Sequence, residues 1–163
     1  MALLLAVAVV ACHKEEQAVV GVAQNAVKAE HQAQAQAQAA ATEIDSQRAQ
    51  FERIPLPTKS LYVNVHEAGA WANPFLTVNA ATLTLRITLP DSARHQEIQV
   101  RPEDLAQALV AVPAGAWRYG RVIAVAESSQ AKPKDRPKLR RNVEAAIQQL
   151  NDLGIVVEEW PVR

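Results

Sequence analysis

The chain has 163 residues, 49% of them hydrophobic, and its 17 Lys and Arg balance its 17 Asp and Glu, so the formal net charge is zero. This length and this apolar content are enough for one ordinary domain with appendages. The charge balance excludes a general electrostatic attraction to nucleic acid or to an anionic membrane, so only local charged patches remain as candidate surfaces. The one cysteine, Cys12, has no disulfide partner in the chain.

The N-terminus has the pattern of an export signal. A short run of small and apolar residues follows Met1 and ends at Cys12, before the polar sequence HKEE. The run is about half as long as a helix that crosses a bilayer, and it is typical of the apolar region of a secretory signal. The alternative is an ordinary uncleaved helix that buries its cysteine.

The sequence VVAC that ends at Cys12 resembles the lipobox of bacterial lipoproteins, although no Lys or Arg precedes the apolar run. The resemblance implies a signal peptide over residues 1–11 and a lipid-modified Cys12 at the start of the mature protein. Buried acyl chains contribute about 0.8 kcal/mol per methylene, so several would anchor the protein in a membrane. His13 stands where an aspartate would favour the inner membrane, so the resemblance implies the periplasmic side of the outer membrane.

A lipidated N-terminus and a stalk are expected over residues 12–53. Between Ala23 and Gln50, Ala and Gln supply 17 of 28 residues, without Pro or Gly. Both are good helix formers, but the segment has too few large apolar residues to bury one face of a helix. The composition therefore predicts a helical or partly frayed stalk, with an alanine-type coiled coil and plain disorder as the alternatives.

The domain is expected over residues 54–163, because the prolines of the sequence IPLP prevent the helix from continuing. Its first half should be rich in strands. Alternating or continuous apolar residues predict strands at 61–65, 75–79 and 83–89, the last with one solvated face. A turn then leads into a strand at 97–100, which should form a hairpin and bury Ile98 and Val100.

The second half of the domain alternates helix and strand. A helix is expected from Pro102 to Val112, and the apolar run 121–127 predicts an interior strand covered on both faces. Apolar spacings of three and four predict a helix over 139–153, closed by Gly154 and followed by a strand at 155–160. The order predicts an α+β fold: a single domain with a mixed β-sheet and two helices on one face.

Two families share features of this half. Residues 58–160 resemble the periplasmic domain of the ExbD and TolR transport proteins. The resemblance lies in the order of elements: a strand, the PEDLAQALV helix, the RVIAVAES strand, the VEAAIQQLNDLGI helix and a final strand. This resemblance implies a soluble partner of a transport complex that dimerises through its domain. That family's membrane helix with a proton-linked aspartate has no counterpart in this sequence, so proton-driven coupling is not implied.

The sequence LRRNVEAAIQQLNDLGI is also similar to a helix of OmpA-like peptidoglycan-binding domains. The resemblance implies that Arg140 or Arg141 binds the ligand. The sequence departs from that family at Ala126 and Glu127, which replace a threonine and an aspartate of its diaminopimelate site.

The strongest local charge feature is the basic stretch KPKDRPKLRR, and within it Lys138, Arg140 and Arg141 are candidate anion-binding residues. Arginines at the start of a helix oppose its dipole, a small cost that a bound anion would offset. The alternative is a solvated loop. If the stretch binds something, an exported setting favours peptidoglycan carboxylates or lipid phosphates over nucleic acid.

The residue types that support catalysis or metal binding are scattered. His66 with Glu67, and His95 with Glu97, lack the close spacing of a metal site, so no metal and no cofactor are expected. Ser128 and its neighbour have no nucleophile elbow and no partnered histidine, so a surface loop is expected there.

The aromatic residues present a similar choice. Trp117 and Tyr119 in PAGAWRYG stand on a connecting segment, where they either form a binding surface or close the core. The loop GAWANP around Trp71 presents the same alternatives.

These features favour a cell-envelope lipoprotein with a non-enzymatic binding or scaffold domain that contacts peptidoglycan or an envelope protein. One alternative is a soluble partner of an ExbD/TolR-type complex. The other is a hydrolase or transferase with a dispersed site, which requires a deep polar pocket that joins His66, His95 or Glu127.

Overall fold

The computed structural model describes residues 5–89 and 94–161, with side chains described from Lys28 onward. Its contacts form two units, Met1–Glu43 and Ile44–Arg163. Residues 1–4 of the expected signal peptide, and the side chains of residues 5–11 and of Cys12, lie outside what the structure describes. In the described part of the chain, no helix combines the length and the apolar character that crossing a bilayer requires.

The expected stalk lies within a long helix, α1 (Leu5–Phe51). From Lys28 to Gln50 nearly every side chain is exposed, as its Ala- and Gln-rich composition predicts. The end of α1 differs from this pattern because Phe51 is only 2% exposed and meets Trp117 edge-to-face, with ring centroids 6.0 Å apart. The compact unit therefore includes the last turns of the helix, before the prolines that the sequence suggested as its boundary.

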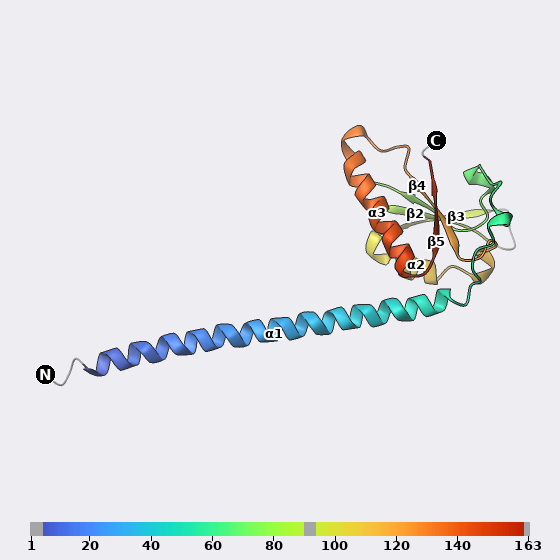
Figure 1. Cartoon of the computed structure of the whole chain (residues 1–163). Helices are drawn as coiled ribbons and strands as arrows, with labels where there is room; N and C mark the ends of the chain where they lie inside the picture. The colour runs from blue at the N-terminus through green and yellow to red at the C-terminus, as the bar shows by residue number, and fades with distance from the viewer. Residues whose placement is uncertain (1–4, 90–93, 162–163) are drawn as a thin grey trace. The chain divides into compact units, whose positions relative to one another are not determined.

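The compact unit contains one five-stranded mixed sheet in the order β3-β2-β1-β4-β5 (Figure 1). β1 pairs antiparallel with β2, and β2 with β3, whereas β1 pairs parallel with β4, and β4 with β5. The strands are β1 (Phe75–Val78), β2 (Leu83–Thr88), β3 (His95–Val100), β4 (Val122–Glu127) and β5 (Val156–Trp160). This arrangement confirms the predicted mixed sheet and five of the six strands expected from apolar patterning.

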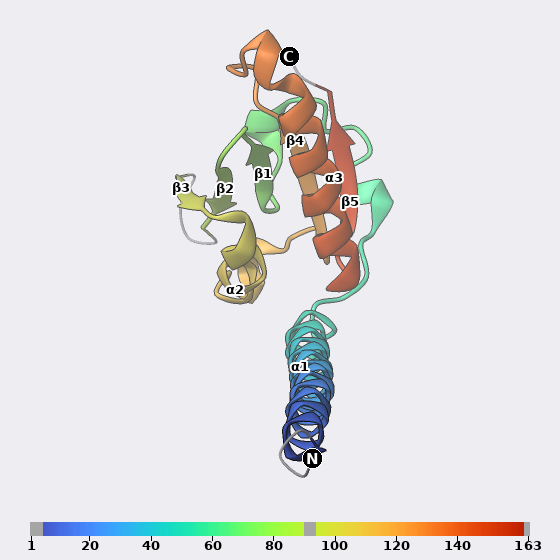
Figure 2. The same cartoon turned by 90° about the vertical axis from the view of Figure 1, so that its left-hand side faces the viewer.

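Helices α2 (Leu105–Val110) and α3 (Arg136–Asp152) cover one face of the sheet (Figure 2). Both helices contribute to one core cluster with the inward residues of β1, β2 and β4, as the prediction of two helices on one face requires. Their buried residues are Leu105, Leu109, Leu139, Val143, Ala146 and Leu150. β4 is buried on both faces, and Gly154 follows α3 with φ of 73°, so the strand and the helix end are also confirmed.

The other face of the sheet is covered by an irregular segment, residues 58–74, where the sequence predicted a strand at 61–65. That prediction is wrong. The segment contains two 3-10 turns, Lys59–Leu61 and Ala68–Ala70, and the apolar residues Leu61 and Val63 remain about half exposed. Within residues 61–65 only Tyr62 is fully buried, because its ring packs into a second core cluster on this face.

Two burial predictions also need correction. Ile98 is 37% exposed, because β3 is an edge strand of which only Val100 is buried. The face of β2 that was expected to be solvated is largely covered, and its Thr88 is only 8% exposed. On the same face the half-buried Arg86 donates a hydrogen bond to the Ala68 carbonyl. The Arg86 guanidinium also lies over the Phe75 ring, 4.7 Å from its centroid. Burial lowers the pKa of Arg86, partly offset by the charge of Glu97.

Candidate functional site

The chain changes direction within the sheet between β1 and β4. From β1 it continues outward through β2 and β3, and from β4 it continues the other way to β5. β1 and β4 are parallel neighbours, so their carboxyl ends lie side by side. In open α/β sheets, ligands bind outside the carboxyl ends of strands at such a topological switch point.

A cavity of about 320 Å³ lies at this position, on the helix-free side of the sheet. We call it the serine-loop cavity. Its wall consists of residues from β1, β4, the end of β5 and the loop after β4: Ala68, Phe75, Thr77, Ala126, Glu127, Ser128, Ser129, Gln130, Trp160 and Pro161. The Ser128 hydroxyl accepts a hydrogen bond from the Gln130 backbone N–H at 3.3 Å, which gives the loop a local turn.

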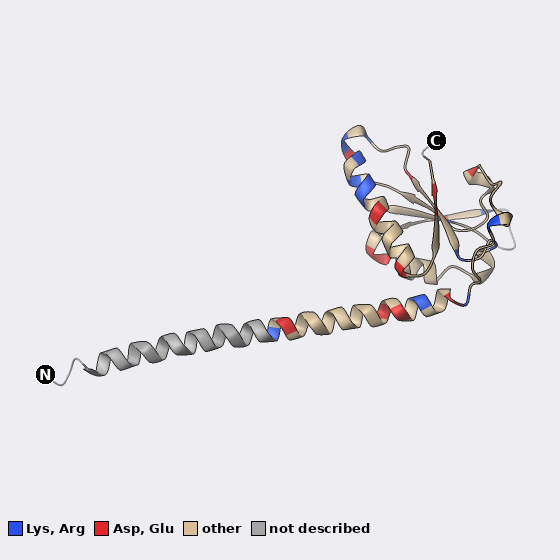
Figure 3. Ribbon diagram, viewed as in Figure 1, with Lys and Arg blue, Asp and Glu red and all other residues tan. Residues whose placement is uncertain are grey.

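The basic stretch borders this loop, because α3 begins shortly after it. Figure 3 shows Lys and Arg gathered at the N-terminal end of α3. Arg140 Nη1 lies 3.3 Å from Glu127 Oε1, and Arg140 Nε lies 3.6 Å from Glu144. Lys138 and Arg141 are exposed. The structure therefore brings Glu127 and Arg140 together, on the helix side of the loop that lines the cavity.

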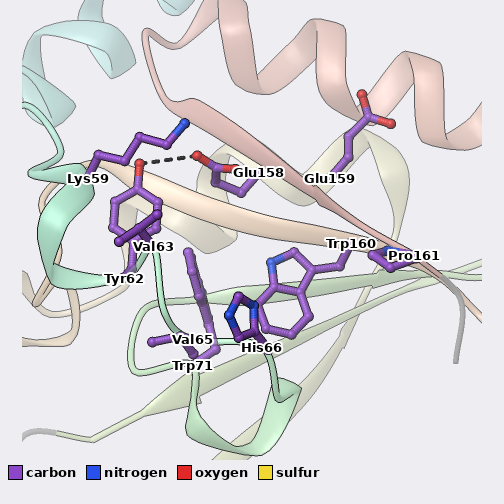
Figure 4. A pocket seen from close by; sticks show the side chains of 10 residues that line it. All are labelled: Lys59, Tyr62, Val63, Val65, His66, Trp71, Glu158, Glu159, Trp160 and Pro161. Atoms are coloured by element: carbon purple, nitrogen blue, oxygen red, sulfur yellow. Dashed lines mark hydrogen bonds between the residues drawn. The ribbon is translucent and has the colours of Figure 1, made fainter.

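A second cavity, of about 310 Å³, lies beside β5 on the helix-free side, and we call it the Tyr62 cavity (Figure 4). It shares Trp160 and Pro161 with the serine-loop cavity, so the two are neighbours. Its other lining residues come from the irregular segment and from β5: Lys59, Tyr62, Val63, Val65, His66, Trp71, Glu158 and Glu159.

The polar centre of the Tyr62 cavity is a hydrogen bond between two chain segments. The Tyr62 hydroxyl donates to Glu158 Oε1 at 3.2 Å (Figure 4). Burial of the ring raises the pKa of Tyr62 above its ordinary value of 10.0, and the negative charge and hydrogen bond of Glu158 raise it further. At neutral pH the phenol therefore keeps its proton and fixes the orientation of the carboxylate.

Aromatic rings form the floor of this cavity. Trp71 is 1% exposed and packs edge-to-face on Tyr62 and Trp160, with centroids 5.4 and 5.6 Å away, and against Tyr119 at 5.2 Å. Its indole N–H donates to the Pro74 carbonyl at 3.0 Å. Trp71 and Trp117 therefore close the two cores, which is the second of the two alternatives that the sequence left open. Trp160 is only partly buried and separates the two cavities.

The residues on which a dispersed catalytic site would depend are not brought together. His66 lines the Tyr62 cavity, Glu127 lies at the end of β4, and His95 is on edge strand β3, where its Nδ1 lies 3.1 Å from the Thr88 hydroxyl. Within the described residues, no three His, Cys, Asp or Glu side chains gather as metal ligands would.

Sequence analysis missed the residues that build the Tyr62 cavity. Tyr62 was placed on a strand that does not form, and Glu158 was an ordinary polar residue in the last strand. The sequence does contain one signal for them: Tyr62, Trp71 and Trp160 are three of only seven aromatic side chains in the chain. Their convergence depends on tertiary structure.

Comparisons with family models, curated proteins and solved structures return no match for this chain. The resemblances to the lipobox, to ExbD and TolR, and to OmpA-like domains therefore stay predictions.

Proposed function

We propose that this protein is a lipoprotein of the bacterial cell envelope, whose α+β domain binds peptidoglycan without chemically altering it. The observation that carries the proposal is the serine-loop cavity at the β1/β4 switch point, whose lining residue Glu127 pairs with Arg140 at the basic start of α3. An exported setting is supported by the short apolar run and the VVAC sequence that ends at Cys12.

The basic helix start suits the stem peptides of peptidoglycan, which carry carboxylates. The Arg140 side chain is 64% exposed and pairs with partners that are themselves in contact with solvent, so these ion pairs contribute little to stability. Its guanidinium can exchange them for a ligand carboxylate in a bidentate arrangement. Lys138 and Arg141 would add charge around such a ligand, while the serine loop offers hydroxyl and amide groups.

Binding without catalysis is supported by how the reactive residue types are distributed. Ser128 has its hydroxyl engaged with the loop backbone, and His66 lies in the neighbouring cavity rather than beside it. A nucleophile needs a base within hydrogen-bond reach. The wall of the serine-loop cavity includes no histidine, cysteine or lysine, and its one carboxylate, Glu127, is paired with Arg140.

Co-sedimentation with purified peptidoglycan tests the binding proposal. The full chain with Cys12→Ser, which prevents lipid attachment, should sediment with the polymer, and a variant that combines Lys138→Gln, Arg140→Gln and Arg141→Gln should lose most of this binding. Arg101→Gln is the control for loss of an exposed, ion-paired arginine outside α3, because Arg101 pairs with Glu103 and Asp104 before α2. Equal sedimentation of the triple variant and the control would overturn the proposal.

The envelope part of the proposal has its own test. Mass spectrometry of the mature protein from host membranes should show an N-terminal Cys12 that carries acyl mass, and this mass should be absent from a Cys12→Ser variant. An unmodified chain that retains residues 1–11 would contradict the lipoprotein assignment. Binding to peptidoglycan in vitro would then not show that the protein meets peptidoglycan in the cell.

A further inference from the structure

The Tyr62 cavity is not used by the stem-peptide site, yet it is built like a ligand site in its own right. It shares Trp160 and Pro161 with the serine-loop cavity, so one extended ligand can occupy both. Its volume of about 310 Å³ lies at the small end of the range for small-molecule sites.

One wall of the cavity is apolar and open to solvent. Val63 is 49% exposed, Val65 is half-buried, and Trp160 presents a partly exposed indole ring (Figure 4). Trp160 is held in place from behind, where it packs edge-to-face on Trp71 and Phe75, both with centroids at 5.6 Å. A rigid aromatic ring and small aliphatic side chains suit the C–H face of a sugar ring and the methyl of an N-acetyl group.

The polar part of the lining comes from Lys59, Tyr62, His66, Glu158 and Glu159. The Glu158 carboxylate accepts the Tyr62 hydroxyl through Oε1 at 3.2 Å, and an ionised carboxylate has further acceptor sites, so Glu158 can also accept hydroxyl groups of a ligand. Lys59 and His66, both exposed, also line the cavity and can donate to a carbonyl. The Glu159 side chain points away from Tyr62 and Glu158 (Figure 4).

The balance of charge narrows the ligand class. Lys59 and Glu158 bring opposite charges to the cavity, and the second carboxylate of its lining, Glu159, points away from Glu158 (Figure 4), so neither an anion nor a cation is strongly favoured. A neutral ligand with hydroxyl donors, an amide carbonyl and an apolar face can interact with both the polar and the apolar residues that line the cavity. An N-acetylated pyranose has these groups, whereas an extended apolar peptide would leave the carboxylate unused.

We propose that the Tyr62 cavity binds an N-acetylated sugar of a glycan, with the sugar ring against Trp160, the acetyl methyl against Val63 and Val65, and hydroxyl groups donated to Glu158. The inference rests on the proposed function for its natural ligand, since a glycan strand would be the other half of the same polymer. The stem peptide would then lie beyond Trp160, toward the serine loop.

A peptide-free glycan tests this site by itself. The full chain with Cys12→Ser is titrated with a β-1,4-linked N-acetylglucosamine tetramer while tryptophan fluorescence or backbone NMR shifts are followed. We expect saturable binding with shifts around Trp160, and affinity at least about tenfold lower for the deacetylated tetramer, which lacks the methyl and the carbonyl.

Paired variants separate the cavity from the surrounding surface. Val63→Glu puts a charge into the apolar wall and should abolish glycan binding, whereas Leu61→Glu, at a residue 56% exposed that does not line the cavity, should leave it unchanged. Both positions are exposed, so both variants should fold. Glu158→Gln keeps an acceptor for Tyr62 but removes the charge, and should weaken binding about tenfold.

The outcomes also separate this inference from the proposed function. Glycan binding that survives Val63→Glu, no binding of the tetramer, or equal binding of the deacetylated tetramer would overturn the sugar site. An extended peptide that binds at β5 and slows amide exchange at Val157 and Glu159 would overturn it too. An isolated stem peptide tests the other site. If the variant at Lys138, Arg140 and Arg141 no longer binds this peptide while Val63→Glu still binds it, the result supports the proposed function independently of the sugar site.

Discussion

The side-chain amide of Asn73 ties the irregular segment to the loop before β4. Asn73 is 1% exposed; its Nδ2 donates to the carbonyls of Gly120 and Val122, both at 2.8 Å, and its Oδ1 accepts the Tyr119 N–H at 2.8 Å. One side chain therefore satisfies three buried or half-buried backbone groups. These bonds position the segment that carries Tyr62 and Trp71 over the sheet.

Replacement of Asn73 should be among the most damaging polar substitutions in the domain. Asn73→Ala leaves the three backbone groups without this partner and should lower the free energy of unfolding by about 3 kcal/mol, measured by urea denaturation. Asn64→Ala, at an exposed position of the same segment, should change it by less than about 0.5 kcal/mol. A small effect at Asn73 would show that water replaces the amide.

The glycines should form a graded series. Gly120 has φ of 85°, and a Cβ there would lie 2.6 Å from the Leu56 carbonyl oxygen, so Gly120→Ala should cost more than about 2 kcal/mol. Gly154→Ala should cost about 1 kcal/mol, because φ is 73° but the nearest atom is 3.6 Å away in the flexible Arg48 side chain. Gly69→Ala meets nothing within 4 Å and should be neutral. Thermal unfolding of the three variants checks this order.

The Tyr62–Glu158 contact should make the domain sensitive to alkali. The folded-state pKa of Tyr62 is raised above 10.0, so its contribution to stability is fully present below that pH and is lost as pH rises through the raised value. Urea midpoints measured from about pH 8 to about pH 11 should fall more steeply for the wild type than for Tyr62→Phe. If the two proteins respond alike, the contact does not control the alkaline loss.

Phe51 should anchor the end of α1 in the domain. Its ring is 2% exposed and belongs to the same core cluster as Trp117, so Phe51→Ala should cost about 3–5 kcal/mol, whereas Gln50→Ala, at an exposed neighbour, should cost little. A fragment of residues 44–163 should accordingly unfold at a higher temperature than one of residues 54–163. Equal melting temperatures would place the fold boundary at the prolines after all.

Local patterning determined most of the elements of this protein. The apolar runs of β1, β2 and β4, the three-and-four spacing of α3 and the glycine after it each carry their own structural preference, so they were predictable from the sequence. The same patterning failed for residues 61–65, where Leu61 and Val63 alternate with polar residues but stay exposed. Alternation of apolar and polar residues indicates which side chains would lie on the same face of a strand. It does not indicate whether another part of the chain covers that face.

The basic start of α3 was predictable from the sequence, because six Lys and Arg within ten consecutive residues form a local feature that does not depend on contacts with the rest of the chain. Its neighbour across the loop, Glu127, became a partner only through the β4–α3 connection. The Tyr62 cavity was determined by tertiary structure alone: the phenol and Glu158 are 96 residues apart, and neither has a local pattern that predicts the other. Long-range packing of the irregular segment on β5 brings them together, and that packing depends on side-chain shape and on the hydrogen bonds of Asn73, which hydrophobic periodicity does not encode.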